Sequence, residues 1–504
     1  MPRHESVWSA TAAMPECGPL EQNVHVDVCV IGGGIAGLST AYHLCQAGRS
    51  VAVLDDGALA SGMTRMTTGH LTNMLDDRYF ELEKLHGKDA IRVAADSHSA
   101  AIERIDEIVR TEGIDCDFSR LDGYLFLAEG DKPGTLDKEL DAAHRAGLKD
   151  VQLMARAPFE WDTGPCLRFP RQGQFHPLKY LAGLAQAIRR DGGRIFCHSH
   201  ADHVEGGVPG LVHVGKHVVT GDAMVVATNV PINNRLAIHT KQAPYMTYVI
   251  AARVPPGSVP QVLAWDTGDP YHYIRLHDDL LIVGGEDHKS GQAHDSPQRY
   301  RKLEAWARER FPMMREVEFM WGGQIMETID YLAFIGHNPM DHDNIFVATG
   351  DSGMGLTHGT IAGMLLCDLI LGRKNPWEKL YSPSRVPVMA AGEFAREDLN
   401  MAAQYADWLT PGDVRSADDV ARDSGAIVRR GFEKIAVYRD ANGAVHECSA
   451  VCPHLGCIVQ WNPGEQTWDC PCHGSRFDAE GHVINGPANR DLPSVQRPEH
   501  KRAA

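Results

Sequence analysis

The chain has 504 residues, of which 43% are hydrophobic, enough for about two to four globular domains. Its formal net charge of −17 and pI near 5.8 disfavour a nucleic-acid binder, whose affinity rests on a basic surface. The first residues lack the apolar core of a signal peptide, and no run approaches about 18 uninterrupted apolar residues, so we expect a cytoplasmic enzyme without a transmembrane segment.

A βαβ unit opens the first predicted domain. A β-rich run at 26–31 leads into the glycine-rich stretch 32–37, a helical pattern follows, and a second β run ends in Asp55. In this setting Gly32 permits a tight turn, Gly34 lets the backbone approach a pyrophosphate, and Gly37 lets the helix pack on the strand. Asp55 would accept hydrogen bonds from a ribose, with Asp56 as the neighbouring alternative. The motif predicts a bound dinucleotide but does not distinguish FAD from NAD.

The elements that follow predict a discontinuous nucleotide-binding domain. Runs at 223–229 and 344–350 are two more strands that end at polar turns. Between them, the runs at 245–254, 271–276 and 280–285 have the turn signals of an antiparallel sheet. We therefore expect an α/β Rossmann-like domain with an inserted antiparallel-sheet (α+β) substrate domain around 240–330.

Four spaced segments resemble the D-amino-acid-oxidase and glycine-oxidase family of FAD-dependent amine oxidoreductases. They are 60–70 (ASGMTRMTTGH), 176–180 (HPLKY), 321–336 and 349–357 (TGDSGMGLT), and the resemblance covers 24–375. It implies that FAD is also held by Thr68, Gly69, Gly350, Gly353, Met354 and Gly355. A helix N-terminus after the last motif would stabilise negative charge on the reduced flavin. Some relatives attach the flavin through a cysteine in the region of 325–327; none occurs there, so we expect non-covalent FAD.

The resemblance also suggests substrate-side residues. Relatives bind a substrate carboxylate with Tyr and Arg, and an alternating strand would place Tyr271, Tyr273 and Arg275 on one face. Tyr273 and Arg275 are therefore candidate catalytic residues, because a forked guanidinium suits a carboxylate. The alternative is a surface or interface strand with a salt-bridged arginine. His70 is a third candidate, and His176 a weaker one; a structural histidine is the alternative for both.

Five of the twelve cysteines lie within the 25 residues 448–472, which indicates a metal or redox site. The segments are CPHLGC (452–457) and CPCHGS (470–475). Cys452, His454, Cys470 and His473 would also suit a zinc ion, which is the alternative to a redox cluster. The scattered Cys29, Cys45, Cys197 and Cys367 lie in apolar patterns, so we expect them to be inert core residues.

These two segments resemble the paired motifs of Rieske [2Fe–2S] proteins, over about 413–500. The resemblance implies that Cys452 and Cys470 hold one iron, that His454 and His473 hold the other, and that Cys457 and Cys472 form a disulfide. It also places the segment 486–488 over the cluster. Ser475 matches a serine that hydrogen-bonds a cluster sulfur, whereas Phe477 stands where high-potential proteins carry tyrosine. We therefore expect a potential below that of the respiratory proteins.

The predicted organisation is an N-terminal extension (1–24), an FAD-dependent oxidoreductase domain (25–375), a linker (376–412) and an all-β Rieske domain (413–504). The two resemblances imply oxidation of a C–N bond of an amine or amino acid. Electrons would pass from FAD through the cluster to an external one-electron acceptor protein or quinone, which favours a dehydrogenase over an oxidase. The alternative is a redox-sensing or electron-carrier protein without an amine substrate. A Rieske oxygenase is disfavoured because no 2-His-1-carboxylate iron domain is recognisable. A homo-oligomer is compatible with this interpretation.

Overall fold

The computed structural model describes residues 2–233, 238–386, 400 and 403–495. The chain separates into two compact units: unit 1 is Met1–His288 with Gln298–Ala395, and unit 2 is Lys289–Pro297 with Arg396–Ala504. A short internal stretch therefore belongs with the C-terminal unit. In the part of the chain that the structure describes, no helix is long and apolar enough to cross a bilayer.

The first sheet of unit 1 has eight strands and a parallel centre. Its main path is β16-β17-β10-β1-β2-β7; β9 (Gly210–Val214) pairs with β10, and β8 (His203–Glu205) pairs with β9. The parallel strands are β1 (Val24–Ile31), β2 (Val51–Leu54), β7 (Arg194–Phe196), β10 (His217–Val226) and β17 (Ile345–Thr349); β16 (Phe334–His337) is antiparallel to β17. The sheet strands are almost continuously apolar because helices cover the sheet.

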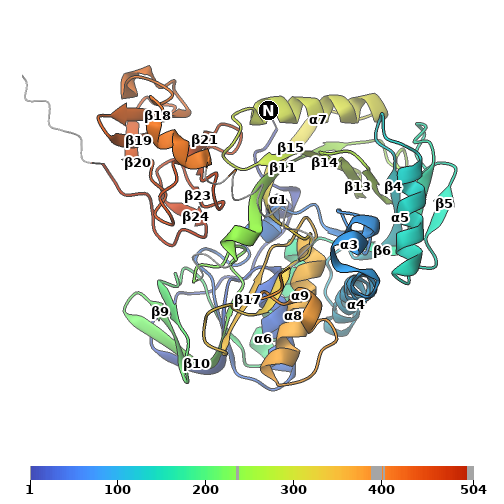
Figure 1. The fold of residues 1–504 in the computed structure, drawn as a ribbon, viewed down its shortest axis with the longest axis horizontal. Helices are drawn as coiled ribbons and strands as arrows, with labels where there is room; N and C mark the ends of the chain where they lie inside the picture. The colour runs from blue at the N-terminus through green and yellow to red at the C-terminus, as the bar shows by residue number, and fades with distance from the viewer. Residues whose placement is uncertain (1, 234–237, 387–399, 401–402, 496–504) are drawn as a thin grey trace, which may run out of the picture. The chain divides into compact units, whose positions relative to one another are not determined.

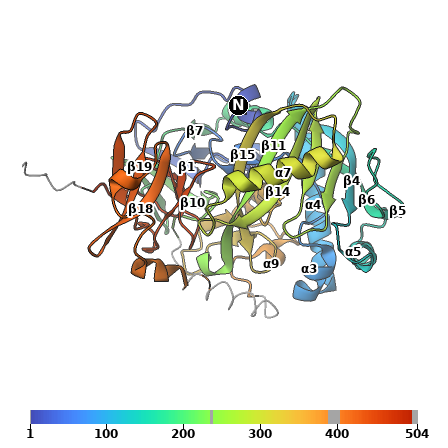
Figure 2. The same ribbon diagram turned by 90° about the horizontal axis from the view of Figure 1, so that it is seen from above.

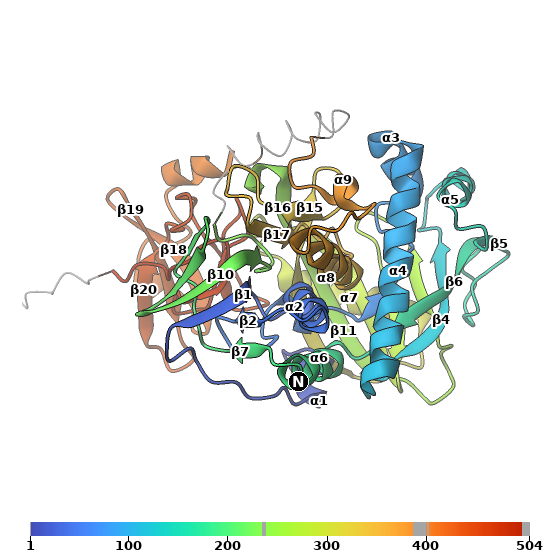
Figure 3. The same ribbon diagram turned by 90° about the horizontal axis from the view of Figure 1, so that it is seen from below.

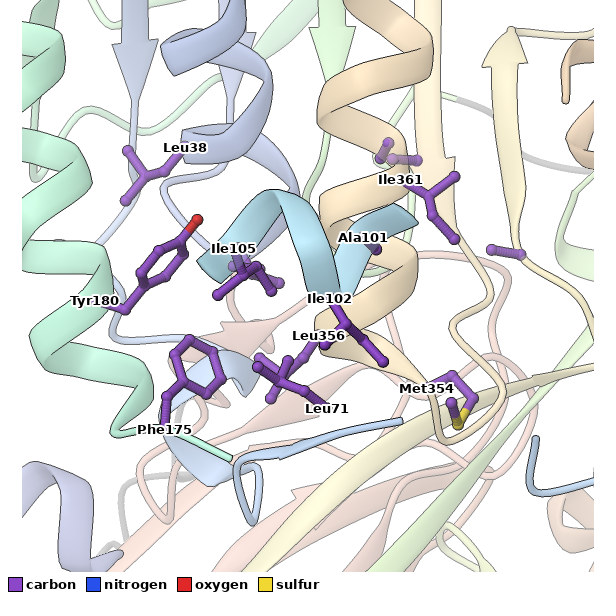
Figure 4. Close-up of a cluster of buried hydrophobic side chains, with 14 of the residues drawn as sticks. Leu38, Leu71, Ala101, Ile102, Ile105, Phe175, Tyr180, Met354, Leu356 and Ile361 are labelled. Atoms are coloured by element: carbon purple, nitrogen blue, oxygen red, sulfur yellow. The ribbon is translucent and has the colours of Figure 1, made fainter. Parts of the chain in front are cut away.

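Helices α2 (Ile35–Gln46), α6 (Pro177–Arg190) and α8 (Gly355–Ile370) pack beside this sheet, together with the long α4 (Lys88–Glu112) (Figures 1 and 3). Figure 4 shows where they meet. Apolar side chains from all four helices converge there with one residue of a strand, Leu71, and one between a strand and α6, Phe175. The set is Leu38, Leu71, Ala101, Ile102, Ile105, Phe175, Tyr180, Leu356 and Ile361. Met354, directly before α8, lies at the edge of this core.

The second sheet of unit 1 has nine strands in the order β15-β11-β14-β13-β12-β4-β6-β3, with β5 (Gln152–Met154) paired to β6. The strands are β3 (His70–Leu71), β4 (Ser119–Phe126), β6 (Cys166–Gln174), β11 (Gln242–Arg253), β12 (Leu263–Asp266), β13 (Tyr273–His277), β14 (Leu280–Lys289) and β15 (Val317–Thr328). Helix α7 (Ser296–Arg310) lies along β11, β14 and β15 (Figure 2), and its Tyr300 and Leu303 join their core. The predicted fold class is confirmed, but the sheet also takes strands from before residue 240.

The shorter elements of unit 1 are α1 (Val7–Thr11), η1 (Met63–Met66), α3 (Tyr79–His86), α5 (Gly134–Arg145), η2 (His239–Lys241) and α9 (Glu378–Tyr381). The predicted linker begins inside this unit, because Tyr381 is fully buried and its hydroxyl lies 2.7 Å from Ser97 Oγ. Arg385 pairs with the buried Asp330 at 2.7 Å. Residues 387–399 and 401–402 of that linker lie outside the described residues.

One cysteine differs from expectation. Cys197, predicted to be an inert core residue, forms a disulfide with Cys17, from which it is 180 residues distant in the sequence. Cys17 lies in the predicted N-terminal extension, and the backbone N–H of Cys197 donates to Gly18 O at 3.1 Å. The sequence pattern shows only that Cys197 is buried; its partner comes from the path of the N-terminal segment.

Unit 2 is built from two antiparallel sheets, which confirms the predicted all-β domain. One sheet contains β18 (Ser424–Arg430), β19 (Glu433–Arg439) and β20 (Val445–Ser449); the other contains β21 (Gln460–Asn462), β22 (Thr467–Asp469), β23 (Arg476–Phe477) and β24 (Val483–Asn485). Two 3-10 helices precede them, η4 (Tyr405–Leu409) and η5 (Ala417–Asp419). Trp461, Trp468 and Phe477 form its core with the clustered cysteines. Residues 496–504, which end the predicted Rieske domain, lie outside the described residues.

Candidate functional site

The glycine-rich loop between β1 and α2 has no room for side chains. Gly32 has φ +106°, and a Cβ atom there would overlap the carbonyl oxygen of Ala227. A Cβ on Gly37 would overlap the carbonyl oxygen of Gly32, so the helix can approach the strand only with glycine at this position. Gly34 is the N-cap residue of α2, and it has no side chain that could bond to the first N–H groups of the helix. This arrangement suits a pyrophosphate at the helix N-terminus.

Asp55 lies at the end of β2 and faces this loop. Its carboxylate accepts hydrogen bonds from Gly33 N at 2.8 Å and Gly57 N at 3.1 Å. Burial raises the pKa of Asp55 to about 6, against the effect of these two N–H donors. Asp56 is directed elsewhere, since its Oδ1 lies 3.0 Å from His200 Nδ1. The placement agrees with Asp55, rather than Asp56, as the candidate ribose ligand.

The second predicted flavin segment, Thr68–Gly69, is held in place by hydrogen bonds from Arg275. The Nη1 atom of Arg275 donates to the carbonyls of Thr68 (2.9 Å), Gly69 (2.8 Å) and Phe175 (3.2 Å). The guanidinium also lies 5.2 Å from the centre of the Trp8 ring. Arg275 is 1% exposed, and burial lowers its pKa to about 9. Arg275 is therefore deeply enclosed and holds this turn through Nη1, and its predicted role in binding a substrate carboxylate stays a prediction.

His70 and Tyr273 are neighbours, with ring centroids 5.8 Å apart. His70 Nε2 lies 3.3 Å from the carbonyl of Ile274, so Nε2 carries the proton and Nδ1 accepts from the Thr68 hydroxyl at 2.9 Å. Burial lowers the pKa of His70 to about 3, which keeps it neutral. Both ring nitrogens are therefore occupied by local partners. The Tyr273 hydroxyl lies 2.8 Å from Thr247 Oγ1.

His176, the weaker candidate, caps α6: its Nδ1 accepts from Lys179 N at 3.3 Å, and its Nε2 lies 3.0 Å from Thr11 Oγ1. Its contacts are those of a structural histidine.

The last predicted flavin motif turns sharply into α8. Gly350 and Gly353 have φ of +71° and +75°, and α8 then begins at Gly355 after Met354, with no side-chain cap. A Cβ on Gly353 would overlap Asp76 Oδ2, which accepts a hydrogen bond from the Tyr271 hydroxyl at 2.8 Å. Asp76 and Tyr271 thus adjoin the turn at which the resemblance places the flavin. Neither helix is closed by a side chain of its own N-cap residue, although Ile35 N of α2 donates to Thr64 Oγ1 at 3.1 Å. The N-termini of α2 and α8 fit the pyrophosphate and the pyrimidine ring of FAD, respectively.

The two cysteine segments of unit 2 form matching loops. Cys452 N donates to Cys457 O at 2.9 Å, and Cys470 N donates to Ser475 O at 2.8 Å. Each loop is tightened by a second bond, from Gly456 N to Cys452 O (2.9 Å) and from Gly474 N to Cys470 O (3.1 Å). Each closed loop therefore presents one cysteine and one histidine from a short, rigid turn.

The predicted ligands come together across these loops. The rings of His454 and His473 lie 4.9 Å apart and nearly perpendicular, at 89°. The Cys452 sulfur accepts hydrogen bonds from the Cys470 thiol, from the backbone N–H groups of His454 and Leu455 and from Ser475, and these contacts lower its pKa despite burial. The bond to Cys452 and burial raise the pKa of Cys470, so one proton is shared within this pair of cysteines. Burial lowers the pKa of His473 to about 4, so its imidazole is neutral. Thiolate and neutral imidazole are the forms that bind metal, and the donor set fits a [2Fe–2S] cluster.

The remaining two cysteines, Cys457 and Cys472, form a disulfide between the loops, with 6.5 Å between Cα atoms. Ser475 Oγ also accepts a hydrogen bond from Ala488 N at 2.9 Å, which ties the predicted covering segment to the second loop. Phe477 is fully buried opposite Trp468 in the β22–β23 pair.

Two further segments of unit 2, which carry no motif in the sequence, support the cluster loops. Gly291 (φ +67°) packs against the second loop, where a Cβ would lie 2.9 Å from Asp469 O and from Pro471 N. From η4, the Tyr405 hydroxyl donates to Leu455 O at 2.8 Å and Trp408 Nε1 donates to Gly456 O at 3.0 Å, both in the first loop. In the sequence, the two aromatic residues at 405 and 408 within the predicted linker were the feature that could have indicated a contact with the cluster loops. Nothing in the sequence around Gly291 indicates its contact.

Comparison with known proteins agrees with both predicted domains. Residues 27–369 match the family described as FAD dependent oxidoreductase, and residues 410–496 match the Rieske [2Fe-2S] domain. The chain is 30% identical over 501 residues to the "Putative Rieske 2Fe-2S iron-sulfur protein YhfW" of Bacillus subtilis, covering 97% of each chain. It is 28% identical to the gamma-glutamylputrescine oxidoreductase of Escherichia coli, over 74% of this chain and 90% of that protein.

Among solved structures, glycine oxidase from Geobacillus kaustophilus shares the fold with a TM-score of 0.63 at 18% identity, over 72% of this chain and 100% of that one. The FAD motifs, the cluster loops and these matches lead to one conclusion. The chain belongs to the FAD dependent oxidoreductase family and carries a C-terminal Rieske [2Fe–2S] domain.

Proposed function

We propose that this protein is a dehydrogenase that oxidises a C–N bond of an amine or amino acid and exports the electrons through its Rieske cluster. The substrate carbon would lose a hydride and the nitrogen a proton, which leaves an imine that water hydrolyses to a carbonyl and free amine. The hydride acceptor would be FAD. The two electrons would then leave one at a time, through the cluster, to two equivalents of a one-electron acceptor such as a cytochrome or a quinone.

The observation that carries this proposal is the complete cluster donor set in the same chain as the FAD fold. The paired loops bring two thiols and two imidazoles together with a thiolate-favouring environment around Cys452. A two-electron acceptor joined to a one-electron relay suits an acceptor other than oxygen. The similarity to a gamma-glutamylputrescine oxidoreductase supports an amine substrate.

Three parts of unit 1 would support the chemistry. The loop with Gly32, Gly34 and Gly37 would hold the pyrophosphate, and Asp55 the ribose. Arg275 would keep the Thr68–Gly69 turn in place through its three carbonyl contacts. The N-terminus of α8, after Gly353, would favour negative charge that develops nearby. Tyr273 remains a candidate for substrate contact.

The test separates substrate oxidation from electron export. Cys470→Ser should leave anaerobic bleaching of the flavin by an amine nearly intact and sharply slow turnover with a cytochrome. Cys448→Ser is the matched control: Cys448 is a free, buried cysteine of the same domain that is not among the predicted ligands, and its thiol donates to Ala436 O at 3.9 Å. It should keep both activities.

Two results would contradict the proposal. If Cys470→Ser turns over with the cytochrome at the parental rate, the cluster is not the exit for electrons. If no amine or amino acid bleaches the flavin of the parent protein, the chain is a redox sensor or electron carrier instead. In the parent protein, formation of peroxide should be slow because the relay competes with oxygen.

A further inference from the structure

The N-terminal segment, residues 3–20, lies outside the part of the chain that matches the FAD dependent oxidoreductase family. It is nevertheless an ordered part of unit 1. Arg3 forms a bridge to β15: its N–H donates to Glu318 O at 2.8 Å, and its carbonyl accepts from Met320 N at 2.9 Å. In α1, Trp8 is completely buried. The segment therefore follows a fixed path through the domain.

The far end of the N-terminal segment is fastened as well. Cys17 is joined to Cys197 by the disulfide, and Arg189 Nη2 donates to Glu16 O at 2.9 Å. Between the two ends, α1 packs against α6, as Figure 3 shows, and against η1. Because the helix and both ends of the segment are held, Trp8 is held with them.

The indole of Trp8 is enclosed by groups from other elements. The centre of its ring lies 5.2 Å from the guanidinium carbon of Arg275, 4.9 Å from the ring of His176 and 5.0 Å from the ring of His277. Its one polar atom, Nε1, donates to Thr67 O at 2.6 Å. A buried indole N–H needs an acceptor, and this bond also fixes the direction of the carbonyl that accepts it.

Four successive backbone carbonyls, those of residues 66–69, accept hydrogen bonds from side chains. The first accepts from Trp321 Nε1 at 2.9 Å and the second from Trp8 Nε1 at 2.6 Å. The third and fourth accept from Arg275 Nη1, at 2.9 and 2.8 Å. All three donor side chains are at most 1% exposed. Trp8 thus supplies a donor in the middle of the row that the other two side chains do not supply.

The turn at 66–69 lies directly on these donors. Gly69 has φ +79°, and a Cβ atom there would overlap Arg275 Nη1 and lie 3.4 Å from Trp8 Cζ2. The backbone at this point is therefore in contact with both side chains. The turn cannot move closer to them, and it can move away only by giving up their hydrogen bonds.

The row of carbonyls decides where the other side of the turn faces. In a planar trans peptide, the C=O of one residue and the N–H of the next point in opposite directions. The N–H groups of Thr67 and Thr68 therefore point away from Trp321 and Trp8. Neither of these two N–H groups donates to another of the described residues, whereas Gly69 N donates to Thr67 Oγ1 at 3.3 Å. Two backbone donors are thus left for a ligand with acceptor atoms.

We infer that Trp8 is a positioning residue of the FAD site: its indole N–H sets the peptide plane between Thr67 and Thr68 and so presents the N–H of Thr68 to FAD. The N-terminal segment thereby completes a site whose other parts lie within the family match. The inference rests on the proposed place of FAD at Thr68 and Gly69. It does not depend on which substrate reacts or on where the electrons go.

The first measurement is the dissociation constant of FAD, obtained from the quenching of FAD fluorescence when the full-length protein is reconstituted. Trp8→Phe keeps an aromatic ring at this position and removes the N–H. We expect the dissociation constant to rise at least about fivefold, because a buried carbonyl loses its donor and the turn is less often in its binding arrangement.

Trp377→Phe is the matched control. Trp377, directly before α9, is also buried, and its Nε1 donates to Asp96 Oδ2 at 3.0 Å. The variant therefore loses the same kind of donor in the same unit, but Trp377 belongs to none of the predicted FAD segments. It should leave the dissociation constant of FAD unchanged.

The second measurement is the midpoint potential of the bound flavin, which separates positioning from a loss of stability. A backbone N–H beside the flavin stabilises the negative charge that reduction adds. Trp8→Phe should therefore lower the midpoint potential, because the N–H of Thr68 is less well aligned. A role confined to packing would weaken folding without shifting the potential. Hydrogen exchange of the amides at 66–69, measured by mass spectrometry on the same protein, should be faster in Trp8→Phe and parental in Trp377→Phe.

Weaker binding of FAD together with a lower midpoint potential, in Trp8→Phe but not in Trp377→Phe, supports the inference. Parental values of both quantities in Trp8→Phe overturn it, and so does an equal change in Trp377→Phe. If Trp8→Phe does not fold, 3-benzothienylalanine at residue 8, which has the shape of tryptophan without the N–H, takes its place in both measurements. Neither measurement uses a substrate or an electron acceptor, so the inference can stand when the proposed dehydrogenase function fails, and can fail when that function stands.

Discussion

Gly353→Ala should destabilise unit 1 more than an ordinary glycine-to-alanine change, because two costs coincide at this residue. Its φ of +75° is a left-handed conformation that L-residues rarely adopt, and its new Cβ would overlap Asp76 Oδ2. Asp76 can move aside only by breaking the 2.8 Å hydrogen bond from the Tyr271 hydroxyl. The change therefore strains the backbone and also displaces the Asp76 carboxylate from Tyr271.

Gly372, at the other end of α8, allows the two costs to be separated. It has φ +68°, but a Cβ there would meet nothing within 4 Å, so Gly372→Ala carries the backbone strain alone, about 1 kcal/mol. Gly353→Ala adds the loss of a hydrogen bond to a group that is mostly ionised above pH 7, about 2 kcal/mol. The expected loss in the free energy of unfolding for Gly353→Ala, from both costs together, is about 3 kcal/mol.

The assay is denaturant unfolding of the full-length protein, followed by the fluorescence of released flavin. In the background Asp76→Ala, the overlap and the hydrogen bond are both absent, so Gly353→Ala should then cost no more than Gly372→Ala. The coupling between positions 353 and 76 would be about 2 kcal/mol. If Gly353→Ala is no more destabilising than Gly372→Ala in the parent protein, Asp76 is not held against the flavin turn, and the reasoning is wrong.

Three other predictions concern the cluster and one buried ion pair. Phe477→Tyr should raise the midpoint potential of the cluster in protein-film voltammetry, because the fully buried ring would then carry a hydroxyl donor near a cysteine sulfur; an unchanged or lowered midpoint would refute this. Cys457→Ser and Cys472→Ser each open a disulfide that spans 15 residues, which should lower the free energy of unfolding by about 3 kcal/mol. Each variant should also lose the absorbance of the cluster faster on heating; a rate of loss equal to that of the parent protein would contradict this. Burial raises the pKa of Asp330, but Arg385 at 2.7 Å outweighs it, and the folded pKa lies below the ordinary 3.8. The stabilisation by the Asp330–Arg385 ion pair is therefore present above about pH 4 and is lost as the pH falls through the folded pKa of Asp330. Asp330→Asn should abolish this part of the loss in stability, measured as the free energy of unfolding at neutral and at acid pH.

The sequence by itself determined the two cofactor-binding halves. The glycine loop and Asp55 are read from a single βαβ unit, because the turn, the helix start and the strand end are all set within about 30 residues. The cluster ligands are equally local. Each loop runs from one cysteine to the residue five positions on, and its own backbone hydrogen bonds shape it, so residue order is enough to predict Cys452, His454, Cys470 and His473 as ligands.

Only the tertiary structure decided what faces the substrate. The alternating pattern around Tyr273 and Arg275 shows which residues share a face of a strand, but not what packs on that face. Arg275 finds its acceptors at Thr68, Gly69 and Phe175, which are 207, 206 and 100 residues distant in the sequence. A buried guanidinium and a substrate-binding one look the same in the sequence, because burial depends on all the neighbouring segments.

The same reason explains the Cys17–Cys197 disulfide and the position of Asp76. Cys17 and Cys197 lie 180 residues apart, and the Asp76 carboxylate meets the turn at Gly353 from a distant segment of the chain. Taken alone in the sequence, Asp76 looks like an ordinary surface residue. Its raised pKa arises from desolvation, which exists only once the chain has enclosed it.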